Sequence, residues 1–397
     1  MKRPYLCIAG KNNIAVDVLN YCINNYDDLN IVCIPNKGTP DYNGWQKSLK
    51  WFAKNNNIDI VTLEDVYDIE GLIFLSLEFD RIIDTKRFKS NKLFNIHFSL
   101  LPKYKGCHTS VLPILFGDSD TGVTLHCIRD GIDTGEIIAQ RKFEVSLKDT
   151  SYNVYNKLIK TGTDLVIDNL SLLISGEYQT FKQESINSSY YSSDYIDYSN
   201  IQLNIKCTAY QIYNQIRAFC FKPYQLIKWN GVEYIDSCIT DSISGFKPGT
   251  ILEDNELYTK ICSIDYDIVM YKNVYDQIVD YIKEGFVDKV DYYSKTDIII
   301  NLLDDKGRSI ITYAVIMNQF DIVHLLYSKG GNSFVKDFDG ANLLFYSIEP
   351  SLKTGDWTTF SFLIENGLNS KEMDYFNRSI WDNIDMNKVP AYIKKLV

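Results

Sequence analysis

Residues 94–106 decide how this chain folds, because an apolar strand there ends in a polar loop that closes on a glycine: Phe94-Asn95-Ile96-His97-Phe98-Ser99-Leu100-Leu101-Pro102-Lys103-Tyr104-Lys105-Gly106. Side chains on a strand alternate in direction, so Asn95 and His97 share one face and their apolar neighbours take the other. In open α/β sheets, ligands bind in the crevice beyond the carboxyl ends of the strands. We therefore expect Asn95 and His97 to border a ligand site.

Short apolar runs with helical patterns between several of them surround this stretch. Strands are predicted at residues 5–9, 30–35, 59–62, 72–77, 93–97 and 123–128. A helix is predicted at residues 14–23, and the alternation is typical of a parallel α/β sheet that spans about the first 180 residues. The first strand-to-helix turn, residues 10–13, lacks the G-x-G-x-x-G pattern, so a nicotinamide cofactor is not supported.

A second turn displays a carboxylate between glycines, in the stretch His126-Cys127-Ile128-Arg129-Asp130-Gly131-Ile132-Asp133-Thr134-Gly135-Glu136. An Asn, a His and an Asp on loops of one sheet are sufficient for acyl-type transfer. The alternative is structural: Asn95 and His97 are a hydrogen-bonding pair at a strand end, and Asp133 is a turn residue. His126 and His108 are interpreted as packing and loop residues.

The composition is that of an ordered globular protein with an acidic balance. The formal net charge of −10 disfavours nucleic acid as a partner, because that binding rests largely on Lys and Arg that neutralise phosphates. No window is long enough for a membrane span, and the start of the chain lacks the core of a signal peptide. The nine cysteines form no C-x-x-C pair, so we expect reduced thiols, no metal site and a cytoplasmic protein.

The chain changes character beyond the first domain. Residues 184–198 are crowded with Ser, Asn, Asp and Tyr, which predicts an exposed connection, and residues 209–219 form an amphipathic stretch. An Asn-Gly turn at residues 230–231 lies between strand-like residues and predicts a hairpin in a small β-rich subdomain.

The last third of the chain contains a repeat. Gly307 and Gly340 lie 33 residues apart in similar contexts, which is the ankyrin period, and each copy continues as a pair of helices. A third, divergent copy begins at Tyr375, and an insertion at residues 353–356 is expected to lie in a loop. The predicted domains are therefore residues 1–183, 184–267 and 268–397.

The motifs of the first domain resemble those of the formyltransferase family that includes methionyl-tRNA formyltransferase, and more closely those of the sugar N-formyltransferases. The matching elements are Asn95-x-His97, Ser99-Leu100-Leu101-Pro102, Gly106 and Asp133-x-Gly135. The resemblance is strong over residues 70–145 and absent from the repeats. It implies a Rossmann-like formyltransferase domain with Asn95, His97 and Asp133 as the catalytic trio.

The trio suits formyl transfer. Imidazole has a reference pKa of about 6.5 and takes up protons near neutral pH, so His97 is the candidate general base for the attacking amine. Asn95 is the candidate donor to the negative oxygen of the tetrahedral state. Asp133 either orients the imidazole or relays protons, and the two roles stay open.

The resemblance also implies the substrates and the residues that hold them. The co-substrate is N10-formyltetrahydrofolate, and the segment that lines its cleft is Ser76, Leu77, Glu78 and Phe79. The candidate contacts with the other substrate are Arg81, Tyr152 and Tyr224. A buried strand and ordinary packing are the alternatives for these positions.

The predicted function is transfer of a formyl group to the amine of a nucleotide-linked sugar, with dTDP as the favoured nucleotide, in glycan or O-antigen type sugar biosynthesis. Methionyl-tRNA formyl transfer is one alternative, although the acidic charge disfavours it. The other is an ankyrin interaction protein with an inactive formyltransferase domain. We expect a homodimer, and repeats that bind a protein or a small ligand.

Overall fold

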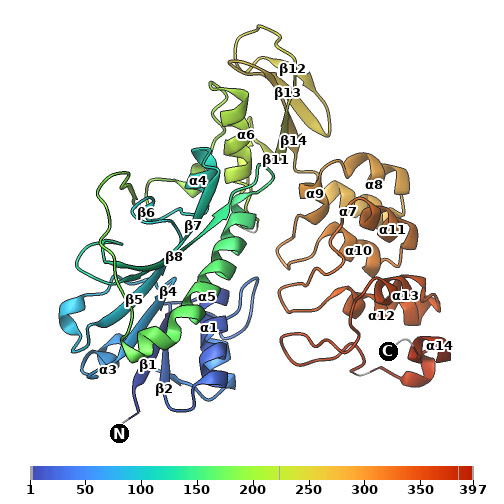
Figure 1. Ribbon diagram of the computed structural model, residues 1–397. Helices are drawn as coiled ribbons and strands as arrows, with labels where there is room; N and C mark the ends of the chain where they lie inside the picture. Colours follow the sequence, from blue (N-terminus) through green and yellow to red (C-terminus); the bar gives the residue numbers. More distant parts are fainter. Residues whose placement is uncertain (1–2, 223, 383, 396–397) are drawn as a thin grey trace. The chain divides into compact units, whose positions relative to one another are not determined.

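The computed structural model describes residues 3–222, 224–382 and 384–395, which form two compact units (Figure 1). The first unit takes the chain up to residue 201 together with residues 217–219. The second takes residues 202–216 and the chain from residue 220 onward. The three-domain boundaries drawn from the sequence stay a prediction.

The first unit is built on a seven-stranded sheet with the order β3-β2-β1-β4-β5-β7-β8. Its strands are β1 (Tyr5–Gly10), β2 (Asn30–Pro35), β3 (Asp59–Ile60), β4 (Ile73–Leu77), β5 (Lys92–His97), β7 (Asp120–Cys127) and β8 (Ile137–Glu144). The first five are parallel, as predicted, but β7 and β8 are antiparallel. The connection after β5 holds no full crossover helix, so the chain stays at that sheet edge and β7 runs back from it.

Helices cover both faces of this sheet. On one face α1 (Asn12–Asn25) packs against α5 (Ser151–Ser175) (Figure 1), and α2 (Leu49–Asn55) contacts α1. The opposite face holds a second apolar cluster. It includes Leu63 and Val66 of α3 (Leu63–Tyr67) and Phe88, which follows the 3-10 turn η1 (Thr85–Arg87). Short segments α4 (Leu112–Leu115) and η2 (Tyr198–Asn200) complete the unit.

The long helix α5 determines which way the end of β5 faces. Thr150 caps the helix start with a capping box, and Gly176 ends it in the left-handed conformation. A Cβ on Gly162 would lie 3.2 Å from Phe98 and 3.4 Å from Ile96, so these side chains face the helix. Because strand side chains alternate, Asn95 and His97 point to the other face.

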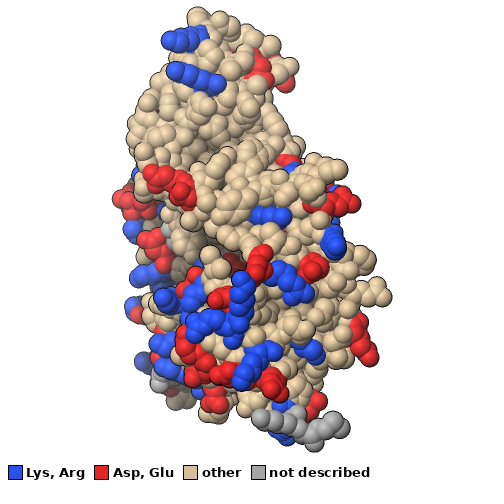
Figure 2. Space-filling view, turned by 90° about the vertical axis from the view of Figure 1, so that its left-hand side faces the viewer, with Lys and Arg blue, Asp and Glu red and all other residues tan. Residues whose placement is uncertain are grey.

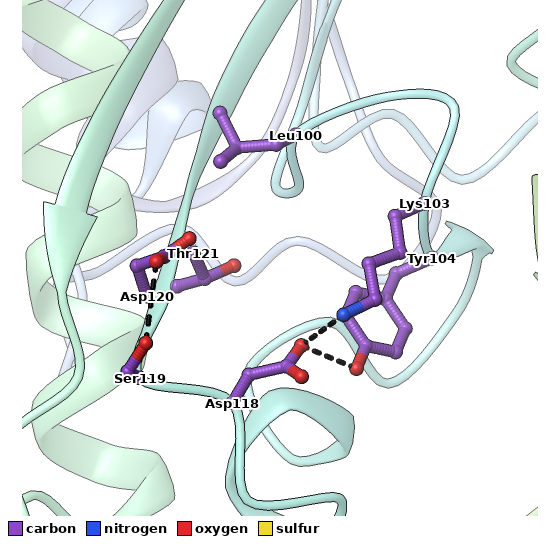
Figure 3. A pocket seen from close by; sticks show the side chains of 7 residues that line it. All are labelled: Leu100, Lys103, Tyr104, Asp118, Ser119, Asp120 and Thr121. Carbon is purple, nitrogen blue, oxygen red and sulfur yellow. Dashed lines mark hydrogen bonds and ion pairs between the residues drawn. The ribbon is translucent and has the colours of Figure 1, made fainter. Parts of the chain in front are cut away.

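The loop after β5 is fastened at several points. It contains β6 (Lys105–Gly106), which pairs in parallel with β9 (Tyr190–Tyr191). Ser99 donates to the Lys103 carbonyl at 2.6 Å, and the Tyr104 hydroxyl donates to Asp118 at 2.6 Å. Figure 3 shows Lys103 and Tyr104 converging on Asp118 beside a cavity of about 180 Å³. This cavity is lined by none of Asn95, His97 and Asp133, and its polar wall anchors the loop.

The second unit opens with a five-stranded antiparallel sheet of order β10-β11-β14-β13-β12. The strands are β10 (Ile227–Trp229), β11 (Val232–Ile239), β12 (Ile251–Asp254), β13 (Tyr258–Cys262) and β14 (Asp267–Lys272), and α6 (Ala209–Ala218) precedes them. The predicted hairpin is confirmed, because β10 and β11 pair across Asn230 and Gly231, whose φ angles are +50° and +79°.

The rest of the second unit is helical. Its elements are α7 (Tyr275–Glu284), α8 (Val287–Tyr293), α9 (Asp297–Asn301), α10 (Ile310–Ile316), α11 (Phe320–Ser328), α12 (Leu343–Thr354), α13 (Thr358–Glu365), η3 (Met386–Lys388) and α14 (Ala391–Lys394). Buried residues from Cys220 to Ile393 form one hydrophobic cluster, so the antiparallel sheet and the helices share a core. No helix in the described ranges is long and apolar enough to cross a membrane.

A turn recurs among these helices. Asp304 accepts from the backbone N–H of Arg308 at 2.8 Å, and 33 residues later Asp337 accepts from that of Ala341 at 2.8 Å. Asp374 makes the same bond to its fourth following residue at 2.9 Å. Each turn therefore has the same internal support. The expected loop insertion at residues 353–356 is partly wrong, because α12 extends to residue 354.

We predict that Gly106→Ala destabilises the first unit more than Gly38→Ala. Both glycines have left-handed φ angles, +86° and +73°, where an L side chain costs about 1–2 kcal/mol. A Cβ at Gly106 would also lie 2.2 Å from the Tyr191 carbonyl oxygen, whereas one at Gly38 meets nothing within 4 Å. The clash should cost about 1–3 kcal/mol more. Urea unfolding of both variants measures the difference, and equal losses would contradict the prediction.

Candidate active site

Three polar groups converge on one carboxylate at the carboxyl end of β5. His97 Nδ1 lies 3.4 Å from Asp133 Oδ2, and His126 Nε2 lies 3.6 Å from Asp133 Oδ1. The backbone N–H of Gly106 donates to Asp133 Oδ2 at 2.9 Å. The side chains of both histidines and of Asp133 are largely withdrawn from solvent. The structure thus brings His97 and Asp133 together, from elements 36 residues apart.

The turn between β7 and β8 holds Asp133 in place. Asp133 has a left-handed φ of +53°. A Cβ on Gly135 would lie 1.7 Å from the Cys127 carbonyl oxygen, so only glycine fits there. Gln183 Nε2 donates to the carbonyl oxygens of Asp133 at 2.8 Å and Gly135 at 2.7 Å. These contacts fix the direction of the carboxylate.

One ring nitrogen of His97 is held in a hydrogen bond, and the other is available to accept a proton. Its Nε2 lies 2.7 Å from the carbonyl oxygen of Tyr104, which only accepts hydrogen bonds, so Nε2 carries a proton. In the neutral ring the lone pair is therefore on Nδ1, on the side of Asp133. Burial lowers the pKa of His97, although Asp133 and the Tyr104 carbonyl oppose the shift. His97 is thus a neutral base that accepts its proton at Nδ1.

Asp133 is held as an anion. Burial raises the pKa of its carboxyl group, but the adjacent imidazoles of His97 and His126 and the hydrogen bond from the Gly106 N–H outweigh burial and lower the pKa to about 2. A negative carboxylate beside Nδ1 stabilises the imidazolium that forms when His97 takes up a proton. The pair can therefore move a proton near neutral pH.

Asn95 reaches this group through His126. The two residues are directly paired in the antiparallel register of β5 and β7, and Asn95 Nδ2 lies 3.1 Å from His126 Nε2. The sequence predicts a packing role for His126, and the residue is buried, but its Nε2 also lies between Asn95 and Asp133. This contact depends on the pairing of β5 with β7, and local sequence patterns do not show which strands pair.

The predicted donor segment lies at the end of β4. Ser76 is buried in the strand, and the carbonyl oxygen of Leu77 accepts from the backbone N–H of Lys11 at 3.2 Å. The carbonyl oxygen of Glu78 accepts from Asn36 Nδ2 at 2.8 Å. Phe79 packs edge to face on Phe74. The parallel register pairs Leu77 with Ile96, so this segment ends beside His97.

The side chain of Glu78 forms a second polar cluster, which the sequence analysis missed. Its Oε2 accepts from Tyr155 Oη at 2.8 Å and from Asn12 Nδ2 at 3.1 Å. Both Asn12 and Glu78 have left-handed φ angles, +63° and +56°. Burial raises the pKa of Glu78, opposed by the nearby Lys11 and by the two hydrogen bonds. A shielded carboxylate therefore lies at the same sheet edge as His97.

The three predicted substrate contacts lie in different places. Arg81 stacks over the ring of Phe79 at 4.4 Å and bonds to Asp80. Tyr152 lies on α5 with its ring 6.5 Å from that of Trp45. Tyr224 belongs to the second unit and is exposed. Arg81 follows β4 and Tyr152 lies on α5, whereas β5, β7 and the loops after them carry the Asp133 group.

Metal ligands do not cluster in the described ranges, where no group of three or more His, Cys, Asp or Glu is placed to hold an ion. The Asp133 group itself presents a base in His97, an anion in Asp133 and an amide in Asn95. Such a set can accept a proton from a nucleophile and donate a hydrogen bond to a developing negative oxygen.

Comparisons with known proteins agree with this chemistry. The family described as Formyl transferase matches residues 77–170, the segment that carries Asn95, His97, His126 and Asp133. A methionyl-tRNA formyltransferase from Endomicrobium trichonymphae is 30% identical over 245 residues, which cover 56% of this chain and 77% of the relative. One from Coxiella burnetii is 27% identical over 221 residues, 52% of this chain and 70% of the relative.

Two solved structures are more similar in sequence. WlaRD, a sugar 3N-formyl transferase solved in the presence of dTDP and 5-N-formyl-THF, is 46% identical with a TM-score of 0.63, and the match covers 68% of this chain and 98% of WlaRD. An N-formyltransferase from Helicobacter canadensis in complex with folinic acid and dTDP-3-aminofucose is 45% identical, also with a TM-score of 0.63, over 68% of this chain and 100% of that one. The chain therefore belongs to the formyltransferase family and is an enzyme that transfers formyl groups.

Proposed function

We propose that this protein transfers the formyl group of N10-formyltetrahydrofolate to the 3-amine of a dTDP-linked amino sugar. The observation that carries the proposal is the arrangement of His97, whose open Nδ1 faces the Asp133 carboxylate beside the Asn95 amide. The choice of acceptor is supported by the high identity to two sugar N-formyltransferases along nearly their whole length.

The reaction exchanges one carbon–nitrogen bond for another. The neutral sugar amine attacks the formyl carbon, and a proton of the amine passes to His97 Nδ1. Asp133 stabilises the imidazolium that results. The bond from the formyl carbon to N10 then breaks, and N10 takes the proton from His97. The products are the N-formyl sugar and tetrahydrofolate, and protons balance without a further reactant.

Asn95 acts on the negative oxygen of the tetrahedral state. One hydrogen of its Nδ2 is directed at His126, which leaves the second as a donor to that oxygen. A donor held in place before reaction stabilises the charge without reorganisation, which is why such groups contribute strongly to rate.

The substrates occupy the sheet edge at the ends of β4 and β5. Residues 76–79 are our candidates for the folate donor, and Arg81, Tyr152 and Tyr224 for the nucleotide. The Glu78 carboxylate, which follows the end of β4, can accept hydrogen bonds from a substrate at that end of the strand. Asn12 and Tyr155 hold this carboxylate in position.

Methionyl-tRNA is the second candidate acceptor, favoured by the names of the sequence relatives. Binding a tRNA needs a basic surface. The chain carries a net charge of −10, and on the face drawn in Figure 2 basic side chains lie among acidic ones. These observations support the sugar.

The helices after residue 268 are proposed to be ankyrin repeats. The support is the aspartate turn at Asp304 and at Asp337, 33 residues apart, each followed by a pair of helices. Such repeats bind proteins or small ligands on their concave surface. An interaction protein without activity is disfavoured, because the Asp133 group is complete. The homodimer remains a prediction.

The proposal is tested by acceptor choice. Purified protein is incubated with N10-formyltetrahydrofolate and, separately, with a dTDP-linked 3-amino sugar, a dTDP-linked 4-amino sugar and methionyl-tRNA. We expect tetrahydrofolate release and a product one formyl group heavier only with the 3-amino sugar, detected by mass spectrometry. Turnover of methionyl-tRNA without turnover of either sugar would overturn the proposal.

We predict that Asn95→Ala lowers kcat by about 10²–10³-fold, because one fixed donor to the oxyanion is removed. His97→Ala removes the proton acceptor and should lower kcat by about 10²–10⁴-fold. Asn24→Ala, on the exposed side of α1, is the matched control and should leave kcat unchanged. Formylation by either site variant at the rate of the control would contradict these assignments.

We predict that kcat is constant across neutral pH and falls only in acid. His97 acts as a base in its neutral form, and burial places its pKa below the ordinary value of about 6.5. Activity is therefore present above that lowered pKa and is lost as pH falls through it. Steady-state rates from pH 5 to pH 9 provide the test. The prediction would be contradicted if kcat of the wild type changed with a midpoint above pH 6.5 and the residual kcat of His97→Ala showed no such change.

A further inference from the structure

We propose that His126 is a positioning residue that sets which end of the Asn95 amide faces the reacting carbon. The expected effect on catalysis rests on the proposed function. The orientation of the Asn95 amide depends only on the side chains of Asn95 and His126. Asn95 is useful as a donor only if its Nδ2, rather than its Oδ1, points to the site. An amide can occupy either orientation, so a neighbour has to distinguish them.

His126 makes that distinction because its own tautomer is fixed. His126 Nδ1 lies 2.8 Å from the carbonyl oxygen of Cys127, which can only accept, so Nδ1 carries a proton. In the neutral ring, Nε2 then presents a lone pair. Asn95 Nδ2 lies 3.1 Å from that lone pair and donates to it. The Cys127 carbonyl therefore fixes the tautomer of His126, and that tautomer makes Asn95 Nδ2 the donor.

The opposite orientation of Asn95 is penalised. If the amide rotated by half a turn, Oδ1 would face the Nε2 lone pair, and two acceptors would meet beside the buried His126 ring. The same rotated Oδ1 would then face the negative oxygen of the tetrahedral state. His126 thus favours the one orientation in which the second N–H of Asn95 Nδ2 remains available to the substrate.

The strand pairing makes this contact reproducible. Asn95 and His126 are opposite residues in the antiparallel pair of β5 and β7, where side chains of paired residues share a face. His126 Nε2 also lies 3.6 Å from Asp133 Oδ1, beyond ordinary hydrogen-bond length. Without a proton, Nε2 cannot donate a hydrogen bond to the carboxylate. It can only accept one, and Asn95 Nδ2 is placed to donate it.

The test compares two substitutions of His126 that differ in whether they keep a hydrogen-bond acceptor. His126→Gln keeps an acceptor near the position of Nε2, whereas His126→Leu removes it at similar size. We expect His126→Leu to lower kcat by about 10²-fold, close to the loss of one oxyanion donor, with the KM of both substrates nearly unchanged. His126→Gln should recover most of that loss. His324→Gln, at an exposed position of α11, is the control for loss of a histidine.

A double-mutant cycle identifies the route of the effect. Because His126 acts through Asn95, His126→Leu should cause little further loss of kcat in an Asn95→Ala background. Multiplicative losses in the double variant would overturn the proposal, since His126 would then act on its own. Circular dichroism and the urea midpoint of each variant show whether a loss of rate reflects unfolding.

A readout without substrate separates this inference from the proposed function. With ¹⁵N-labelled asparagine, the Asn95 side-chain NH₂ signal should show one hydrogen-bonded proton in wild type and in His126→Gln, and none in His126→Leu. Identical Asn95 signals in wild type and His126→Leu would overturn the inference. If wild type fails to formylate the amino sugar while these signals behave as expected, the proposed function fails and the positioning role stands.

Discussion

The carboxylate of Asp133 is the buried charge on which the arrangement of the site depends. Burial of an ionised group is costly unless it is hydrogen-bonded or paired, and Asp133 accepts from the Gly106 N–H and lies within 3.6 Å of two imidazoles, of which His97 can take up a proton. Each of these groups comes from a different part of the chain. The loop after β5, the end of β5 itself and β7 must therefore all be in register before the carboxylate is satisfied.

The fold supplies that register through the reversal of chain direction after β5. A parallel continuation would have required a crossover helix and would have left no antiparallel partner for Asn95. Because β7 runs back along β5, Asn95 meets His126, and the following turn returns Asp133 to the same edge. The long helix α5 covers the opposite face, which leaves the polar face of the β5 end free for chemistry.

The sequence predicts part of this site and not the rest. Strand alternation places Asn95 and His97 on one face, the turn between glycines displays Asp133, and the family resemblance identifies the three as a catalytic trio. His126 could not be recognised, because its role depends on which strand pairs with β5, and a run of residues does not specify its partner. The Glu78 cluster depends on two left-handed backbone positions that carry no sequence signature beyond the residues themselves. The central parallel strands follow their apolar runs closely, whereas β8 and α5 were not anticipated.

The central claim is that His97 is a neutral base whose open nitrogen, Nδ1, faces an ionised Asp133. ¹⁵N NMR of the imidazoles as a function of pH tests it directly, since the protein has only four histidines. The account predicts that neutral His97 carries its proton on Nε2, that Nδ1 titrates with a pKa below about 6.5, and that Asp133 stays ionised throughout. A neutral ring protonated on Nδ1, or a His97 pKa above 6.5, would contradict the account.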